Sequence, residues 1–322
     1  MKNIADRLNE KITKLKSPIV VGLDPKLSEI PDCYKDRLEK SENKFEEISK
    51  IIVEFNKDII DSIYDIVPAV KPQMAFYEMY GEYGVKAFIQ TVKYAKSKGL
   101  FVIDDSKRND IGNTAKCYAK GHLGKVDLGN GQFEEVFGAD FLTVSPYLGL
   151  DSIVPFIEEC KENDKGIFVL VKTSNPSSSD IQDRLVDDGK TIYENVAKFV
   201  KEQADELIGE TGYSSIGAVV GATFPEEAAK LRKIMSNNIF LVPGYGAQGG
   251  KAKDVMYCFN ENGLGALVNS SRGIIYAYKK HFEKDLCTKE EYKKSVREAT
   301  ISMREDIVSL SLIHIWRCRR LV

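Results

Sequence analysis

Residues 101–115 read FVIDDSKRNDIGNTA, an apolar run that passes directly into a cluster of charges. The apolar part is typical of a buried parallel strand. Asp105, Lys107 and Asp110 follow close together, and charges at such a position are costly to desolvate unless they have partners. At the carboxyl end of a strand in an α/β protein they indicate a reacting site. The alternative is a solvated loop with incidental salt bridges.

Seven further apolar runs occur along the chain, and longer stretches with helical periodicity separate most of them. The clearest helical stretches are 42–64, 83–99 and 191–209. Several runs are apolar throughout rather than alternating, as expected of strands buried on both faces. The full set of eight runs lies at 17–24, 65–72, 99–105, 139–146, 166–173, 215–222, 238–244 and 264–270.

Eight strand–helix units predict an α/β protein with the (β/α)8 TIM barrel fold, an N-terminal helix and a C-terminal helical extension. We assign residues 1–309 to this single barrel domain. A doubly wound open sheet is the alternative. The first predicted strand ends in Gly-Leu-Asp-Pro (22–25), without a Gly-rich dinucleotide fingerprint, and this disfavours the open sheet.

The composition excludes several classes of protein. The net charge of −2 over 322 residues gives no global field for nucleic acid or an anionic membrane. No apolar run reaches the length of a bilayer span, and the N-terminus resembles neither a signal nor a transit peptide. Six cysteines without Cys-x-x-Cys spacing fit a reducing compartment better than a zinc site or a disulfide framework. We therefore predict a cytoplasmic protein that binds neither nucleic acid nor membrane.

Polar residues end nearly every predicted strand. Because all strands of a barrel end at one mouth, these side chains should converge there. The long polar segment 174–190 is predicted to be a lid over that mouth, with a disordered surface insertion as the alternative. The converging residues are Asp24, Lys71, Asp105, Lys107, Ser145, Lys172, Thr173, Ser174, Gln248 and Arg272.

The last two strand–helix units have the features of a phosphate site. Residues 243–250, PGYGAQGG, form a Gly-rich turn whose backbone N–H groups can approach an oxyanion. Ser271 and Arg272 begin the next helical segment, where a guanidinium suits a dianionic phosphate. Barrels often bind phosphate after their seventh and eighth strands. A flexible turn and a surface arginine are the alternative.

Taken together, the motifs resemble those of the orotidine 5′-phosphate decarboxylase family, in the family's order, from about residue 17 to about residue 305. KPQ and TSNP resemble the longer of the family's two forms. The resemblance implies conversion of orotidine 5′-monophosphate (OMP) to UMP and CO2, the last step of pyrimidine nucleotide synthesis, with no cofactor and no metal. The motifs are VGLDP, KPQMAFYE, DDSKRNDIGNTA, VKTSNP, PGYGAQGG and SSRG.

The resemblance also implies roles for individual residues. Lys107 would protonate C6 of the pyrimidine, and Asp105 would lie beside the departing carboxylate. Asp110 and Ile111 would reach into the partner subunit's site, so a homodimer is expected. Lys71 would complete the catalytic set of Lys107, Asp105, Asp110 and Lys71. The implied substrate-binding residues are Asp24, Lys71, Ile111, Thr114, Ser174, Pro243, Gln248, Ser271 and Arg272.

The residue types fit the implied chemistry. Loss of CO2 from C6 leaves a carbanion with no π system to delocalise it, so the protein must supply electrostatic stabilisation. Lys107 offers a fixed positive charge and then a proton. Asp105 lies two residues away on an extended strand and is therefore expected on the same face.

Two other functions remain open from the sequence. One is a related phosphate-binding barrel lyase that acts on a sugar phosphate. The other is a non-catalytic nucleotide-binding barrel, although a binder gains little from burying Asp105, Lys107 and Asp110.

Two features receive no catalytic role. His122, His281 and His314 are predicted to be surface or helix-end residues away from any acid, nucleophile or metal cluster. Residues 310–322, LSLIHIWRCRRLV, contain the only tryptophan of the chain and are rich in arginine. We interpret this atypical tail as foreign to the gene, with a short basic tail that touches a partner or a membrane as the alternative.

Overall fold

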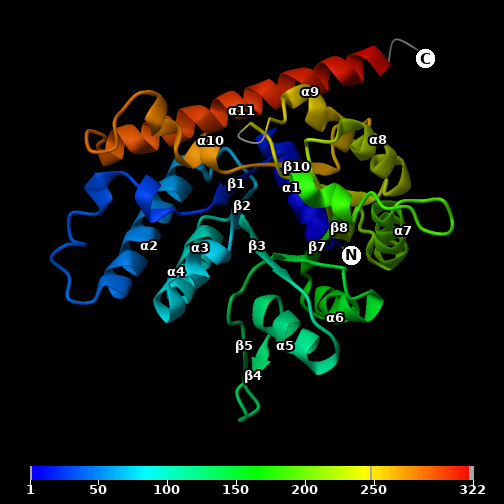
Figure 1. The fold of residues 1–322 in the computed structure, drawn as a ribbon, viewed down its shortest axis with the longest axis horizontal. Helices are drawn as coiled ribbons and strands as arrows, with labels where there is room; N and C mark the ends of the chain where they lie inside the picture. The colour runs from blue at the N-terminus through cyan, green and yellow to red at the C-terminus, as the bar shows by residue number, and fades with distance from the viewer. Residues whose placement is uncertain (1, 247–248, 319–322) are drawn as a thin grey trace.

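The eight predicted apolar runs each overlap one strand of a closed barrel. A computed structural model describes residues 2–246 and 249–318. Its parallel strands follow the order β1-β10-β9-β8-β7-β6-β3-β2, which confirms the predicted barrel (Figure 1). The barrel strands are β1 (Ile19–Leu23), β2 (Ala69–Pro72), β3 (Phe101–Arg108), β6 (Phe141–Val144), β7 (Gly166–Lys172), β8 (Ser214–Val220), β9 (Asn238–Val242) and β10 (Ala266–Ser270).

Helices surround the barrel on the outside (Figure 1). Three of them match the helical stretches expected from periodicity, and α1 and α11 are the predicted N-terminal helix and C-terminal extension. The helices are α1 (Ile4–Leu15), α2 (Lys44–Ile63), α3 (Ala75–Glu78), α4 (Gly81–Ser97), α5 (Gly112–His122), α6 (Val154–Asn163), α7 (Ile192–Ala204), α8 (Pro225–Ile234), α9 (Ala252–Val255), α10 (Arg272–Ile275) and α11 (Lys289–Cys318).

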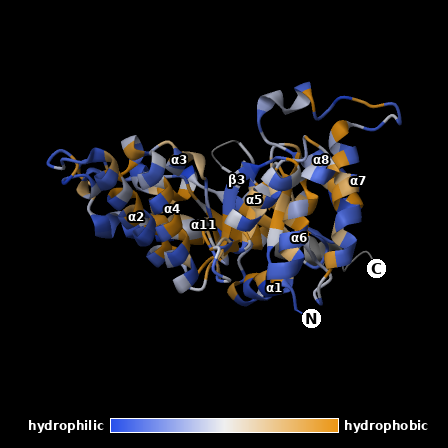
Figure 2. Cartoon of the chain, turned by 90° about the horizontal axis from the view of Figure 1, so that it is seen from below, coloured by the Kyte–Doolittle hydropathy of each residue, from blue (hydrophilic) through white to orange (hydrophobic). Residues whose placement is uncertain are grey.

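The core has two layers. One layer lies between the strands and the helices, and the other fills the inside of the barrel. Figure 2 shows the apolar strands at the centre of the molecule and the helices with mixed faces around them. Phe141, Phe168 and Leu267 belong to the inner layer, together with Ile4 and Leu8 of α1. Helix α1 therefore closes the end of the barrel opposite the mouth.

Asp6 fixes α1 to the barrel. Its carboxylate completes a capping box with Asn3 at the start of the helix. The same carboxylate accepts the backbone N–H groups of Glu210 (2.9 Å) and Thr211 (2.7 Å), just before β8. Burial opposes its charge, but these hydrogen bonds outweigh burial and lower the pKa of Asp6. The closed end of the barrel is thus held by hydrogen bonds as well as by apolar contacts.

Two parts of the chain lie outside the predicted pattern. A short hairpin of β4 (Val126–Asp127) and β5 (Phe133–Glu134) projects from the barrel after α5 and was not predicted (Figure 1). Helix α11 continues beyond residue 309, where we placed the end of the barrel domain. The origin of residues 310–322 stays a prediction. Within the described residues, no helix is both long enough and apolar enough to cross a membrane.

Arg232 of α8 is hydrogen-bonded to three segments of the backbone. Its buried guanidinium donates to the carbonyl oxygens of Cys258 (3.0 Å), Asn238 (2.8 Å) and Gly265 (2.7 Å), and also to that of Met235 (2.8 Å). It also lies 3.6 Å from the centroid of the Phe240 ring. Burial lowers the pKa of Arg232 to about 10. Arg232 therefore satisfies four carbonyl groups that have little access to water.

Replacing Arg232 by methionine should lower the free energy of unfolding by about 3–5 kcal/mol, because the substitution removes four buried hydrogen bonds to carbonyl oxygens. The oxygens of Met235 and Gly265 each keep one backbone donor. Urea unfolding followed by circular dichroism measures the change. Lys233→Met, at the exposed neighbouring position of α8, is the control and should stay within about 0.5 kcal/mol of wild type. A loss below about 1 kcal/mol for Arg232→Met would contradict the structural role assigned to this residue.

Candidate active site

A pocket of about 430 Å³ lies at the mouth of the barrel, where the strands end. Its position matches that of active sites in TIM barrels. The structure brings together most of the site residues expected from the sequence. Those that line the pocket are Asp24, Lys71, Asp105, Lys107, Thr173, Ser174, Pro243, Ser271 and Arg272.

A row of alternating charges crosses one side of the pocket. The Asp105 carboxylate accepts from Lys71 Nζ through Oδ2 and from Lys107 Nζ through Oδ1, each at 2.6 Å. Asp105 and Lys71 are buried, whereas the side chain of Lys107 is 45% exposed. One ammonium group is therefore locked into the wall, and the other faces the space where a ligand would bind.

The charges hold one another in the ionised state. Burial disfavours the charged form of Asp105, but attraction from Lys71 and Lys107 outweighs burial and holds the pKa of the carboxyl well below its usual range. Burial likewise opposes the charge of Lys71. The carboxylates of Asp105 and Asp24 outweigh that effect and raise the pKa of Lys71 above its ordinary value.

A bulge in β3 presents Lys107 to Asp105. The pairing with β6 places Asp104 opposite Leu142 and Arg108 opposite Val144, so residues 105–107 lie opposite a single residue. Lys107 has a φ of 49°, in the left-handed region that non-glycine residues rarely adopt. The expected contact between the side chains of Asp105 and Lys107 is present, but it does not arise from a regularly extended strand, as we expected. The strand is not regularly extended there, and the bulge turns Lys107 toward Asp105.

Thr143 was not predicted from the sequence, and it forms hydrogen bonds with both Asp105 and Lys107. Its buried hydroxyl accepts the backbone N–H of Lys107 (2.9 Å) and donates to Asp105 Oδ1 (3.0 Å). The signal was present in Phe-Leu-Thr-Val (141–144), where alternation places the threonine on the inner face beyond Phe141. The fourth strand therefore contributes Thr143 to the pocket, whereas Ser145, which we expected there, is not among the described residues that line it.

Asp24 lies beside the charge row at the end of β1. One of its carboxylate oxygens, Oδ1, is buried and has no hydrogen-bond partner among the described residues. Its backbone carbonyl accepts from the Tyr276 hydroxyl at 2.9 Å, which holds the turn after β1 in place. An unpaired buried carboxylate oxygen is costly, so Asp24 is suited to accept a donor from a ligand.

The opposite side of the pocket carries the predicted phosphate residues. A Cβ atom at Gly22 would lie 1.8 Å from Ser271 Oγ, so only glycine at this position of β1 leaves room for that hydroxyl. Arg272 begins α10 next to it. Gly244, which also lines the pocket, has a φ of 99° that favours glycine. Gln248 lies outside the described residues.

Three expected site residues do not line this pocket within the part of the chain that the structure describes. Asp110, Ile111 and Thr114 follow β3 at the start of α5, where Ile111 is 52% exposed. Their side chains are therefore available on the rim of the barrel rather than inside it.

Lys172 is also away from the pocket, contrary to our expectation. A register shift in β7 between Leu170 and Lys172 turns the lysine outward. Its fully buried ammonium lies 4.5 Å from the centroid of the Phe224 ring and pairs with Asp183 of the 174–190 segment. The segment is folded against the barrel by this pair and by two hydrogen bonds between Thr173 and Gln182.

The prediction for His122 was right that it ends a helix and wrong that it lies away from any acid. His122 ends α5, but it is buried, and its Nδ1 lies 2.6 Å from Asp104 Oδ2. Its position continues the buried face of Ala115 and Ala119, a spacing that could have predicted burial. His281 is exposed at a helix end, as expected, and the side chain of His314 lies outside the described part. Within the described ranges, no three His, Cys, Asp or Glu side chains cluster as a metal site would need.

Comparison with known proteins gives one consistent family. Residues 17–283 match the family described as "Orotidine 5'-phosphate decarboxylase / HUMPS family". The chain is 44% identical to orotidine 5'-phosphate decarboxylase from Rhodopirellula baltica over 307 residues, which cover 95% of this chain and 99% of that protein. It is also 44% identical to the protein of that name from Clostridium tetani over 303 residues, with 94% and 97% covered.

Solved structures agree with the sequence relatives. The OMP decarboxylase of Leishmania donovani superposes with a TM-score of 0.71 at 28% identity, covering 96% of this chain and 99% of that one. The UMP synthase of the same organism superposes with a TM-score of 0.72 at 30% identity. This second match covers 97% of our chain, which spans 57% of the length of the synthase.

Proposed function

The chain belongs to the orotidine 5′-phosphate decarboxylase / HUMPS family, and on this premise we propose that its pocket converts OMP to UMP and CO2. The single observation that carries the proposal is the Asp105 carboxylate held between the ammonium groups of Lys71 and Lys107 at the barrel mouth. An ammonium group beside a carboxylate suits a decarboxylation. The substrate carboxylate leaves as CO2, and a carbanion forms on the carbon that carried it.

The proposed chemical step is simple in its electron balance. The bond between C6 and the carboxylate carbon breaks, CO2 leaves, and the electron pair stays on C6. The Lys107 ammonium stabilises the developing negative charge and then transfers a proton from Nζ to C6. The neutral amine afterwards regains a proton from solvent. Asp105 orients Lys107 and disfavours the substrate carboxylate by like-charge proximity, which departure of CO2 relieves.

We infer that the rest of the pocket binds the nucleotide. Asp24 and Lys71 are suited to the ribose hydroxyls, and the unpaired Oδ1 of Asp24 supports this assignment. Ser174 is proposed to contact the pyrimidine edge, which would account for its place in the pocket lining. The phosphate is assigned to the opposite side of the pocket, to Pro243, Gln248, Ser271 and Arg272.

Binding energy from the phosphate has a further proposed role. Closure of the 174–190 segment over the bound nucleotide would exclude water and strengthen the charge interactions inside. The nucleotide would then help the reaction through a group that does not itself react. We propose that the reaction needs no cofactor or metal and takes place in the cytoplasm.

We further propose that the chain acts as a homodimer in which Asp110, Ile111 and Thr114 complete the partner's site. Exposed apolar side chains on the rim of the barrel mouth support this, because such patches mark interfaces. Ile111, Met79 and Tyr147 lie on the rim beyond the neighbouring strands β3, β2 and β6, and Tyr147 is 77% exposed. Two copies joined by this rim would bring each Asp110 to the other copy's pocket.

Mixing two inactive variants tests the shared site. Lys107→Ala and Asp110→Ala chains, unfolded together and refolded, should recover up to about a quarter of wild-type activity, because half of the random dimers have one intact site of two. The assay is OMP turnover per chain. Lys107→Ala mixed with Asp105→Asn is the control and should recover nothing. Lys107 and Asp105 both serve the site of their own chain, so each site of the mixed dimer carries one of the two substitutions. Equal recovery in both mixtures, or none in either, would rule out the shared site.

The function itself is tested with the intact chain and OMP in a buffer that contains a chelator. We expect loss of the orotate absorbance and formation of UMP. A sugar-phosphate lyase that uses a Schiff base would instead leave OMP unchanged and be trapped covalently by borohydride in the presence of its substrate. A folded chain that binds UMP tightly without any turnover of OMP would favour the non-catalytic binder.

A further inference from the structure

The outward face of β3 carries a second polar cluster, directly behind the charge row. Asp105 faces the inside of the barrel, whereas Asp104 faces outward and is fully buried against α5. Its Oδ2 lies 2.6 Å from His122 Nδ1, and its Oδ1 accepts from the Ser106 hydroxyl. Adjacent residues of one strand therefore belong to two clusters, one on each face.

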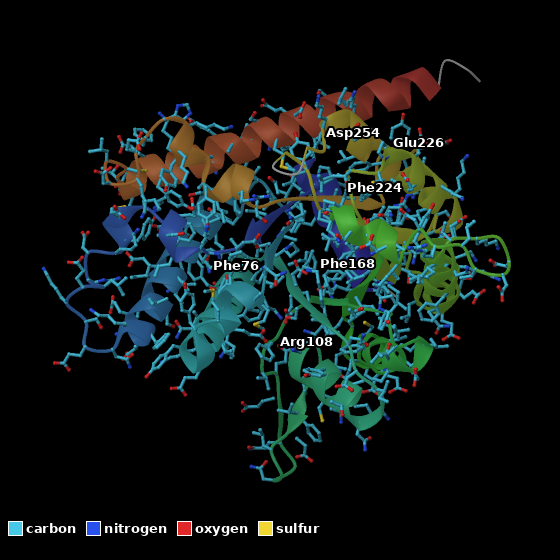
Figure 3. The ribbon with its side chains drawn as sticks, viewed as in Figure 1. Phe76, Arg108, Phe168, Phe224, Glu226 and Asp254 are labelled. Atoms are coloured by element: carbon cyan, nitrogen blue, oxygen red, sulfur yellow. The ribbon has the colours of Figure 1, made fainter. Side chains whose placement is uncertain are left out.

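The hydrogen bonds fix the tautomer of His122. Arg108 Nε–H donates to His122 Nε2 at 3.3 Å, so Nε2 acts as the acceptor. Nδ1 must then carry the proton and donate to Asp104. Arg108 is itself held by an ion pair with Glu78, and it lies beside α5 near Tyr118 (Figure 3).

Packing restricts His122 as well. Its ring stacks on Phe137 with 4.4 Å between the centroids and 8° between the planes. His122 ends α5, the helix that follows the Asp110 loop, so the Asp104–His122 bond ties both ends of the segment 104–122 together. The bulge of residues 105–107 lies inside this closed segment.

We propose that Asp104 and His122 form a positioning pair that fixes the β3 bulge and thereby the Lys107 ammonium against Asp105. The inference deepens the proposed function and rests on it. Lys107 sits in a left-handed conformation that costs free energy and persists only where the surroundings impose it. On the inner face Thr143 holds the Lys107 amide, and on the outer face Asp104 holds Ser106. Neither residue of the pair touches the substrate.

Two amide substitutions separate positioning from folding. His122→Asn places an amide nitrogen near the position of Nδ1 and keeps a donor to Asp104. His122→Gln, one methylene longer, reaches toward Arg108 instead and leaves Asp104 Oδ2 without a donor, while the Ser106 hydroxyl still donates to Oδ1. The two variants remove the same ring and its stacking on Phe137, so a merely structural role would affect them alike.

We expect His122→Gln to lower kcat for OMP by roughly 10–100-fold, because small displacements of a catalytic group have effects of this size. His122→Asn should stay within about threefold of wild type, and UMP affinity should be unchanged within about threefold in both. Hydrogen exchange supplies a readout that needs no activity. The peptide containing residues 104–111, with the Lys107 amide, should exchange faster in His122→Gln than in His122→Asn, while the rest of the barrel exchanges alike in the two.

Wild-type kcat in His122→Gln would overturn the inference, as would equal losses and equal exchange in the two variants. Failure of the proposed function gives a different result, because wild type itself would then not turn over OMP. The exchange of residues 104–111 would still decide the positioning claim in that case, since faster exchange confined to His122→Gln supports it and equal exchange overturns it.

Discussion

Lys107→Ala should retain the fold and bind UMP, yet lose turnover of OMP by at least about 10⁴-fold in kcat. The substitution removes the positive charge that faces the reacting carbon and the proton that C6 receives. Electrostatic stabilisation and general acid catalysis each contribute roughly 10²–10³-fold or more, and Lys107 is proposed to supply both. Because the side chain is 45% exposed, its loss leaves no buried cavity. The expected defect is therefore in the chemical step.

Steady-state turnover at saturating OMP, together with UMP affinity by calorimetry, measures this separation of binding from chemistry. Lys93→Ala, on an exposed part of α4, is the control and should match wild type in both. A Lys107→Ala enzyme with kcat within about tenfold of wild type would contradict the proposed role of Lys107, since a proton donor contributes more than that.

Asp105→Asn should harm both activity and stability. The carboxylate is the shared acceptor for Lys71 and Lys107, and its removal leaves the buried Lys71 ammonium without its closest anion. Breaking a buried pair by removing one partner costs about 3–5 kcal/mol at neutral pH. We expect kcat to fall by about 10³-fold or more, because Lys107 is no longer held in place. OMP affinity should not fall, since the repulsion between Asp105 and the substrate carboxylate is also gone.

The stability effect has a defined dependence on pH. The pKa of Asp105 is lowered in the folded protein, so its contribution is complete above the pKa of an unfolded aspartate, about 4, and is lost as the pH falls below it. The difference in unfolding free energy between wild type and Asp105→Asn should therefore shrink below about pH 4. Urea unfolding between pH 3 and 8 tests this. Glu206→Gln, whose exposed carboxylate pairs with Lys161 on the surface, is the control and should unfold much like wild type.

The barrel could be predicted from the sequence because periodicity reports burial directly. Continuous apolar runs separated by amphipathic stretches left few other arrangements, and each run overlaps a strand. Because parallel strands end at one mouth, the polar residues at the strand ends also predicted most of the pocket lining, although Ser145 and Lys172 are not among the described residues that line it. The same reasoning could have found Thr143, which follows the alternation of its strand.

The failures come from bulges and from long-range packing. Alternation places Lys172 inside the barrel, but a register shift in β7 turns it outward into contact with Phe224. A bulge in β3 gives Lys107 a left-handed backbone conformation that no pattern of residue types predicts. His122 was expected away from any acid because its partner Asp104 lies on another element. The hydrogen bond between Asp104 and His122 depends on how α5 packs against β3. The residues around each position do not predict that packing.

The most direct test follows the carboxyl carbon itself. Wild type and Lys107→Ala are each incubated with OMP that carries an isotopic label in the carboxylate, and released CO2 and UMP are counted together. The proposed reaction predicts one CO2 and one UMP for each OMP consumed by wild type, and no release above background by a variant that still binds UMP. Wild type that releases no labelled CO2, or a variant that releases it at the wild-type rate, would contradict decarboxylation by Lys107 in this pocket.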